Sequence, residues 1–263
     1  ICEQLGLEHY NASKIQRWSS AVTAQIGRMQ NREQMIENAR QICELQNFII
    51  GQVRDREANP REDMISDLVH ARTADGGKLG FAEVVSLVRA LVIAGNETTA
   101  TAIGNLLFVL ATQPEHARQL HENIDDDRYV TRFVEELLRI APPVRGLAKM
   151  TTRETELGGQ KLPKGAHMLV LYASGNDDET QFECPAKFDL NRGNIGLHVA
   201  FGVGIHRCIG ASLARMEIKV AAREIVKRLD NIRLAVAAED IPYLPTVATH
   251  SIAHLPLTFT RRR

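Results

Sequence analysis

One ten-residue segment, FGVGIHRCIG (Phe201 to Gly210), combines a single cysteine with three glycines, a histidine and a phenylalanine. Glycines permit tight turns and a close approach of the backbone to a flat ligand. Cys208 stands where an amphipathic helix is expected to begin, and the N–H groups and dipole of a helix N-terminus favour the thiolate form. A thiolate ligates metal, and a lone thiolate suits haem, which needs only one strong protein ligand on that face.

The same segment fits other cysteine or glycine-rich sites poorly. Arg207 stands where the third glycine of GxGxxG would fall, and no P-loop lysine pattern is present. The other three cysteines form no CxxC pair, so neither a zinc ribbon nor a thioredoxin motif is indicated. A cysteine hydrolase using Cys208 stays an alternative, although His206 is close in sequence and such partners usually come from distant positions. A small buried apolar cysteine is the structural alternative.

The pattern Phe-Gly-x-Gly-x-His-x-Cys-x-Gly closely resembles the haem-binding loop of the cytochrome P450 family, especially of its soluble bacterial members. This resemblance implies haem b (iron protoporphyrin IX) as the cofactor, with Cys208 as the proximal thiolate and metal ligand. It also implies that Phe201 shields the thiolate and that His206 contacts a haem propionate. The cofactor-binding residues expected in the loop are Phe201, Gly202, Gly204, His206, Arg207, Cys208 and Gly210.

A second motif, AGNETT (Ala94 to Thr99), lies within a long apolar stretch. A carboxylate there is costly unless it is paired or functional, and a capped polar residue at a helix bend is the structural alternative. In the P450 family this pattern lies across the distal haem face. The resemblance implies that the helix loosens at Gly95 to admit dioxygen. It further implies that the Thr98 hydroxyl and the Glu97 carboxyl relay the protons that dioxygen cleavage consumes.

Two segments are expected to be structural. Glu136 and Arg139 in EELLR are spaced i, i+3 and can share a helix face, which alone usually makes a surface ion pair. In this order they resemble the family's Glu-x-x-Arg pair, which holds the loop leading to the cysteine. PAKFDLNR (Pro185 to Arg192) resembles the meander before that loop. Lys187 stands where many relatives have arginine or histidine, and it lacks the guanidinium fork.

The remaining haem and substrate contacts are indicated by family analogy alone. On the haem side, Lys149 stands where relatives commonly carry a propionate-binding arginine; it keeps the charge but loses the bidentate geometry. Arg145, as a buried cation, could pair with a substrate carboxylate, whereas a side chain turned toward a propionate or solvent would play no such part. The expected pocket residues are Leu91, Ala94, Gly95, Val144, Arg145 and Leu147.

These residues require helices and a few strands to position them. Apolar residues cover nearly every face of Phe81 to Pro114, which predicts a buried helix of roughly 30 residues. Alternation and Gly-Gly and Pro-Lys-Gly turns predict short strands within 146–173. Further helices are expected at about 15–29, 36–53, 64–69, from 114, 128–140 and 210–229. Between them we expect a polar loop at 55–63, a turn at 73–80 and a loop-rich stretch at 174–200. The tail is expected to form short strands.

Composition excludes several classes. Lys and Arg together number 32, as do Asp and Glu, so no global charge points to nucleic acid or an anionic membrane. Glu83, Arg89 and Glu97 interrupt the longest apolar stretch, which argues against a membrane span. No secretory signal is visible, so a cytoplasmic location is the default expectation.

The resemblance implies a mainly α fold with small β sheets, corresponding to the C-terminal larger part of the P450 fold. We expect residues 1–263 to form a single partial domain, because the first residues resemble the middle of a family member. The implied function is a monooxygenase that inserts one oxygen atom from dioxygen into a small organic substrate. Electrons would come from a ferredoxin or flavodoxin-type donor, since no flavin, nicotinamide or iron–sulfur motif is present. A truncated, catalytically inert haem-binding protein is the alternative.

Overall fold

The computed structural model describes residues 1–27, 30–72 and 74–262. The chain divides into two compact units, Ile1–Thr98 and Thr99–Arg263. The boundary falls inside one helix, α5 (Phe81–Thr112), and not at a linker. The long helix expected from the apolar stretch is therefore confirmed, and each unit contains part of it.

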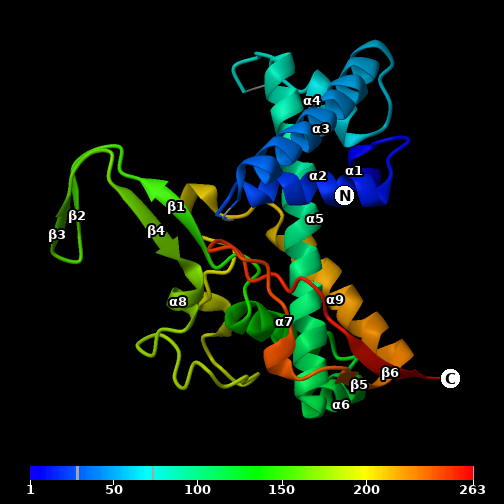
Figure 1. Ribbon diagram of the computed structural model, residues 1–263, viewed down its shortest axis with the longest axis vertical. Coiled ribbons are helices and arrows are strands. Elements are labelled where there is room, and N and C mark those ends of the chain that lie inside the picture. Colours follow the sequence, from blue (N-terminus) through cyan, green and yellow to red (C-terminus); the bar gives the residue numbers. More distant parts are fainter. Residues whose placement is uncertain (28–29, 73, 263) are drawn as a thin grey trace. The chain divides into compact units, whose positions relative to one another are not determined.

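The first unit is helical (Figure 1). Its helices are α1 (Cys2–Leu5), α2 (Ala12–Ala24), α3 (Arg32–Ala58), α4 (Met64–His70) and the first part of α5. Asn11 caps α2 by accepting a hydrogen bond from the Lys14 N–H, and Asn31 and Gln34 form a capping box at the start of α3. Buried leucine, isoleucine and valine side chains from α3, α4 and α5 make its core.

Helix α3 continues into the segment 55–63, which the sequence predicted to be a polar loop throughout. The reason is Arg56, whose side chain is buried and donates hydrogen bonds to Asp63 (2.8 Å) and Asp55 (2.7 Å). These ion pairs neutralise the buried Arg56 charge in the last turns of α3, so the helix can continue to Ala58.

The second unit contains the rest of α5, further helices and three two-stranded antiparallel sheets (Figure 1). The helices are α6 (Pro114–Glu122), α7 (Asp127–Ile140), α8 (Tyr172–Asn176) and α9 (Ala211–Arg228), with 3-10 turns η1 (Ile195–Leu197), η2 (Gly204–His206) and η3 (Ala238–Asp240). The sheets pair β1 (Gly146–Met150) with β4 (His167–Leu171), β2 (Thr155–Leu157) with β3 (Gln160–Leu162), and β5 (Leu229–Leu234) with β6 (Leu257–Arg261). The mainly α fold with small sheets is confirmed.

Helix α8 was not predicted, because its five residues lie where the chain was expected to change from strand to loop. Asn176 ends α8, and its side-chain oxygen accepts a hydrogen bond from the Val199 N–H at 2.7 Å. The helix thus depends on a partner more than twenty positions later in the chain, which local patterns do not reveal.

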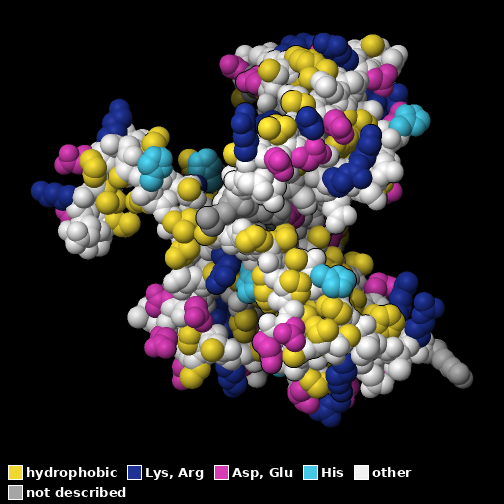
Figure 2. All heavy atoms as spheres, viewed as in Figure 1, with side chains coloured by type: hydrophobic (Ala, Val, Ile, Leu, Met, Phe, Trp, Pro, Cys, Tyr) yellow, Lys and Arg dark blue, Asp and Glu magenta, His cyan; other side chains and the backbone are white. Residues whose placement is uncertain are grey.

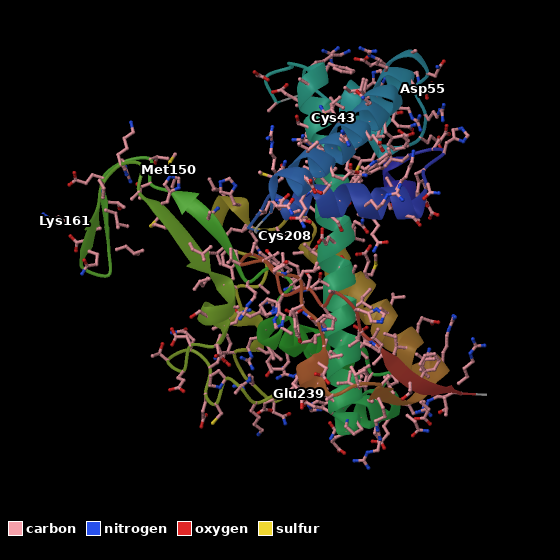
Figure 3. The ribbon with its side chains drawn as sticks, in the orientation of Figure 1. Cys43, Asp55, Met150, Lys161, Cys208 and Glu239 are labelled. Carbon is pink, nitrogen blue, oxygen red and sulfur yellow. The ribbon has the colours of Figure 1, made fainter. Side chains whose placement is uncertain are left out.

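The surface mixes charged and apolar side chains (Figure 2). The labelled Met150 ends β1, and Lys161 lies in β3 of the β2–β3 hairpin, which connects β1 to β4 (Figure 3). Both strand pairs are largely exposed. Within the described residues, none of the helices is both long enough and apolar enough to cross a membrane.

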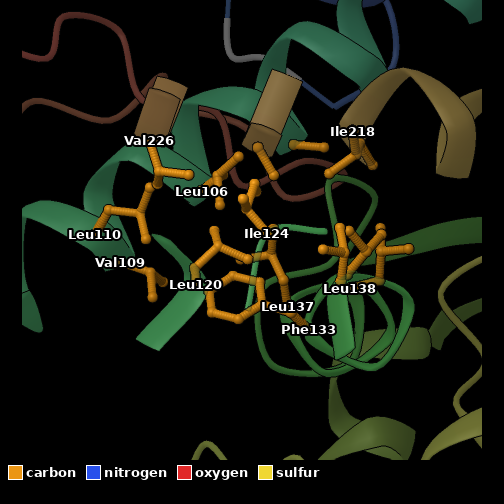
Figure 4. Packing of buried hydrophobic residues seen from close by; sticks show 14 of the residues in the cluster. Leu106, Val109, Leu110, Leu120, Ile124, Phe133, Leu137, Leu138, Ile218 and Val226 are labelled. Atoms are coloured by element: carbon orange, nitrogen blue, oxygen red, sulfur yellow. The ribbon is translucent and has the colours of Figure 1, made fainter. Parts of the chain in front are cut away.

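The core of the second unit is one apolar cluster to which α5, α6, α7 and α9 contribute (Figure 4). Leu106 and Leu110 of α5 meet Phe133 and Leu137 of α7 there, and all four are buried. Burial of a side chain of this size contributes about 1.5–3 kcal/mol, so this cluster fixes where α7 and α9 lie.

Burial along α5 is one-sided, which corrects the expectation of a helix buried all round. Val84, Val88 and Val92 are buried, whereas Phe81 and Leu87 are exposed. The valines are spaced four residues apart and share a face that packs in the core of the first unit. No described part of the chain covers the face that carries Leu87.

Candidate functional site

The cysteine loop is closed by its own backbone. The Gly202 N–H donates to Val199 O (2.9 Å) and the Arg207 N–H to Gly204 O (3.1 Å). The Cys208 N–H donates to Phe201 O at 2.9 Å, which joins the two ends of the loop. Gly202 and Gly204 have φ values of 66° and 74°, a left-handed conformation that other residues adopt only with strain. Glycine is therefore required at both positions by the turn itself.

The thiol of Cys208 is exposed and lies just before α9, whose N-cap is Gly210 (Figure 3). Its neighbours Ile205 and Ile209 are 97% and 93% exposed, and Val203 is also exposed. A Cβ at Gly204 would meet no atom within 4 Å. Isoleucines are seldom left this open, so the loop presents an apolar surface around a thiol.

These features fit haem. The cofactor is large, flat and mostly apolar, and its iron needs one protein thiolate on the proximal side. Among the described residues there is no cluster of three or more histidine, cysteine or acidic side chains that could hold a metal ion. Cys208 as a haem ligand stays a prediction.

A partly buried ion pair lies next to the loop. Arg215 of α9 donates from Nε and Nη2 to the two carboxylate oxygens of Glu135 on α7, at 2.6 and 2.9 Å. His198 Nε2 is 3.0 Å from Glu135 Oε2, and its Nδ1 accepts from the Ala200 N–H. The Arg215 guanidinium carbon lies 4.4 Å from the centroid of the Phe201 ring, a cation–π contact.

Burial opposes ionisation of Glu135, but the hydrogen bonds from His198 and Arg215 outweigh it and lower the pKa of Glu135 to about 2. Glu135 is therefore a carboxylate at neutral pH. Sequence reasoning missed Glu135, His198 and Arg215. The first glutamate of EELLR was the only signal, and its partners are 63 and 80 positions away.

The neighbouring Glu136 organises a second network. Arg139 donates to both oxygens of Glu136, at 2.9 and 2.8 Å, and Arg192 Nε donates to Glu136 Oε1 at 2.9 Å. The same two guanidinium groups donate to backbone carbonyls of the segment 176–187, including Asn176 (2.9 Å), Pro185 (2.7 Å), Cys184 (2.8 Å) and Lys187 (2.8 Å).

Lys187 enters this network through its carbonyl and not through its charge. Its side chain is 68% exposed, and its Nζ lies 3.5 Å from Asp189. The second guanidinium comes from Arg192 instead, five positions later, where the chain turns back toward Glu136. Arg139 and Arg192 each donate both to Glu136 and to carbonyls of the segment 176–187, which is the arrangement expected of a structural network.

The cations expected near haem propionates are all on the surface. Lys149 is an exposed residue of β1, opposite Met168 of β4. His206 and Arg207 are exposed on the cysteine loop. Their contacts with propionates stay predictions.

Arg145 is exposed and not buried, which agrees with the alternative of a side chain turned toward a propionate or solvent rather than with a buried cation. It lines a cavity of about 650 Å³ together with Leu169, Leu171 and Thr246. Its backbone is fixed on both sides, since its N–H donates to Ala248 O at 2.7 Å and its carbonyl accepts from the Ala173 N–H at 3.0 Å.

The two flanking positions expected in the pocket are partly buried. Val144 forms an isolated antiparallel bridge with Thr249, and Leu147 belongs to β1. Their contacts with a substrate stay predictions.

The AGNETT segment belongs to the first unit up to Thr98. Helix α5 runs through it without interruption, so the expected loosening at Gly95 is absent from this helix as described. A Cβ at Gly95 would lie 2.5 Å from Ile1 Cδ1, so the missing side chain gives Ile1 room to pack. Ala94 is exposed and Leu91 packs at the edge of the first unit's core.

The two proposed relay residues have local partners. The Thr98 hydroxyl donates to Ala94 O at 2.7 Å, one turn back in the same helix. Glu97 accepts a hydrogen bond from the Thr23 hydroxyl of α2 at 2.5 Å. Thr98 and Glu97 belong to one unit and Cys208 to the other, so their place opposite the haem ligand stays a prediction.

Comparison with known proteins gives one family. The model of the cytochrome P450 family matches residues 18–233. Over 257 residues the chain is 32% identical to 6-deoxyerythronolide B hydroxylase from Saccharopolyspora erythraea, covering 98% of the chain and 61% of that protein. It is 31% identical to cytochrome P450 144 from Mycobacterium tuberculosis, covering 98% of the chain and 57% of that protein.

Solved structures agree. Cytochrome P450 CYP109Q5 from Chondromyces apiculatus superposes with a TM-score of 0.86 at 34% identity, over 99% of this chain and 63% of that one. Cytochrome P450 CREJ gives a TM-score of 0.90 at 29% identity, over 98% of this chain and 64% of that one. The chain thus spans about three fifths of the length of these relatives.

Proposed function

We propose, from the premise that the chain belongs to the cytochrome P450 family, that it is the haem-binding part of a monooxygenase. The reaction would insert one oxygen atom of dioxygen into a small organic substrate and reduce the other to water. The observation that supports this most is the exposed Cys208 thiol on a loop closed by glycine turns. Haem b, the cofactor of this family, supplies the redox-active iron for the reaction when it is bound.

The chain's own residues would do three things. Cys208 would ligate the iron, and the hydrogen bond from its N–H to Phe201 O holds that residue in register. His206 and Lys149 would hold haem propionates by charge. Thr98 would relay protons, because its hydroxyl already donates to Ala94 O and its oxygen stays available as an acceptor. Glu97 would supply the neighbouring acid of that relay.

Electrons would come from a separate ferredoxin or flavodoxin-type protein. Within these 263 residues no motif for flavin, nicotinamide or an iron–sulfur cluster is present. The exposed Arg207 next to Cys208 offers a positive charge to an acidic partner. We expect Arg207→Glu to lose coupling to such a donor; because Arg207 is also an expected haem contact, electron transfer is compared per haem bound.

The substrate is proposed as a small organic acid. Arg145 lines the 650 Å³ cavity and offers a guanidinium that can bind a carboxylate with two parallel hydrogen bonds. Two relatives are named 6-deoxyerythronolide B hydroxylase and methyl-branched lipid omega-hydroxylase, and the lipid named in the second makes mainly aliphatic acids the first to try. Unchanged affinity of Arg145→Leu for carboxylate ligands would contradict the acidic preference.

The function is tested by oxidation itself. The chain reconstituted with haem is given a reducing ferredoxin system and aliphatic acids, and hydroxylated product is compared with dioxygen consumed. We expect product in the intact chain and a lower ratio of product to dioxygen in Thr98→Ala, because proton delivery then fails at a defined step. Stable haem uptake without product from any substrate would instead support the inert haem-binding alternative.

A further inference from the structure

Arg215, which pairs with Glu135 next to the cysteine loop, contacts the ring of Phe201. The carbonyl of Phe201 accepts the hydrogen bond from the Cys208 N–H. We propose that Arg215 is a positioning residue for Cys208: fixed by Glu135, it holds the Phe201 ring and so the backbone that carries the thiol. The proposal rests on the proposed role of Cys208 as haem ligand, but the contacts that carry it belong to the protein alone.

The guanidinium of Arg215 has little freedom. Both of its donors toward Glu135 are within 3 Å of separate carboxylate oxygens, a fork geometry that fixes the plane of the group. Its Nη1 also lies 3.4 Å from Ala211 O in the first turn of α9. A lysine at this position would keep the charge but could not keep the plane.

Glu135 is itself fixed from the other side by His198. The Nδ1 of His198 accepts from a backbone N–H, so the Nε2 carries the proton that faces the carboxylate. The ring of His198 also lies near Phe201, with centroids 6.2 Å apart. The side chains of His198 and Glu135 are 1% and 12% exposed, so the charge-assisted bonds act where water competes little.

Phe201 links the fixed Arg215 side chain to the backbone that carries the Cys208 thiol. Its ring contacts the Arg215 cation, and its carbonyl accepts the Cys208 N–H at 2.9 Å. An axial ligand has to be held within a fraction of an ångström to keep its metal bond in shape. The contacts that close the loop are otherwise backbone hydrogen bonds, so the ring of Phe201 is the side-chain contact through which Arg215 can act on the end of the loop.

The exchange of the Cys208 amide hydrogen with deuterium reports this contact in the haem-free chain. Arg215→Met keeps the length of the side chain and removes its charge. We expect the Cys208 amide to exchange about tenfold faster, the size that a partly desolvated cation–π contact supports. Arg223→Met is the matched control, because Arg223 is also on α9, pairs with Asp127 and is 28% exposed against 26% for Arg215. It should change the exchange less than about twofold.

Two further variants separate positioning from general stability. In a Phe201→Leu background, Arg215→Met should add nothing, because Arg215 acts through the ring. Arg215→Lys should exchange only about threefold faster, since it keeps the charge, and it serves as the test should Arg215→Met fail to fold. Equal exchange in the Arg215 and Arg223 variants, or a full effect of Arg215→Met without the Phe201 ring, would overturn the proposal.

The haem-bound chain gives a second readout. The absorption band of thiolate-ligated ferrous haem with carbon monoxide should lose intensity in Arg215→Met and keep it in Arg223→Met. If haem does not bind to the parent chain while the exchange pattern holds, the proposed function fails and the positioning of Cys208 by Arg215 stands. If haem binds and the exchange pattern is absent, only the positioning fails.

Discussion

Adjacent glutamates of α7 do different work in the second unit. Glu136 is fully buried and shares its two oxygens between Arg139 and Arg192, whose remaining donors go to backbone carbonyls. Glu135 is less buried and binds Arg215 and His198, whose other contacts lead to the ring of Phe201. One network holds the chain that leads to the cysteine loop, and the other holds the loop itself.

The two networks differ in how exposed the arginines are that would lose their counter-ion if the glutamate charge were removed. Removal of the charge of Glu136 leaves two guanidinium groups buried without a counter-ion, which is among the most costly defects in a protein interior. Arg215 is partly solvated, so water can take over much of its pairing after loss of Glu135. A buried network can therefore set stability while its neighbour sets local geometry.

The largest effect is expected for Glu136→Gln. The variant keeps the shape of the side chain but strands Arg139 and Arg192, so the free energy of unfolding should fall by about 3–5 kcal/mol. Urea unfolding at neutral pH measures it. Glu115→Gln is the control, because Glu115 forms an exposed pair with Arg118, and its loss should cost less than about 0.5 kcal/mol. Similar costs for both variants would refute the special role of Glu136.

Acid should act through Glu135. Its folded pKa, about 2, is lower than that of an ordinary glutamate, so its pairing stabilises the fold above the unfolded pKa and is lost as pH falls toward 2. The contribution is on the order of 2–3 kcal/mol. The free energy of unfolding, measured in urea from pH 6 down to acid, should fall less steeply below about 4.5 in Glu135→Gln. An unchanged slope would show that other carboxyls dominate.

Arg192→Lys is expected to cost about 2 kcal/mol, because lysine keeps one charge but loses most of the fork's hydrogen bonds to Glu136 and to the Cys184 and Lys187 carbonyls. Equilibrium unfolding gives the cost. A free energy within error of the parent chain would mean that the two guanidinium groups are not equivalent and that Arg139 alone holds the segment.

Lys187→Ala should have the smallest effect, within about 0.5 kcal/mol, because the lost side chain is solvated and its carbonyl stays in place. The same unfolding experiment applies. A large loss would restore the structural part that the sequence assigned to the Lys187 side chain.

The sequence predicted the elements better than their partnerships. Helices α5, α7 and α9 and the β1–β4 hairpins follow from periodicity and turn residues, and the cysteine loop follows from a motif of ten residues. Arg192 was missed because the resemblance drew attention to Lys187, five positions earlier, where many relatives have arginine or histidine. Arg215 and His198 were missed since their partner, Glu135, is far away in the chain.

Burial was the other property that local patterns misjudged. An apolar helix such as α5 was expected to be enclosed, yet Leu87 is exposed, because apolar composition shows which faces can be buried and not which are covered. For Arg145 the sequence left a buried and a solvent-turned side chain open, and the exposure of this residue favours the second. The division into two units at Thr98 could not be predicted from a linker sequence, because it falls within helix α5.

The carbon monoxide difference spectrum of the reduced, haem-reconstituted chain tests the central claim most directly. The parent chain and Cys184→Ser, which changes another exposed cysteine, should both give the band typical of thiolate-ligated ferrous haem. Cys208→Ser should lose that band. The same band in Cys208→Ser, or its absence from a parent chain that has taken up haem, would contradict the assignment of Cys208 as the iron ligand.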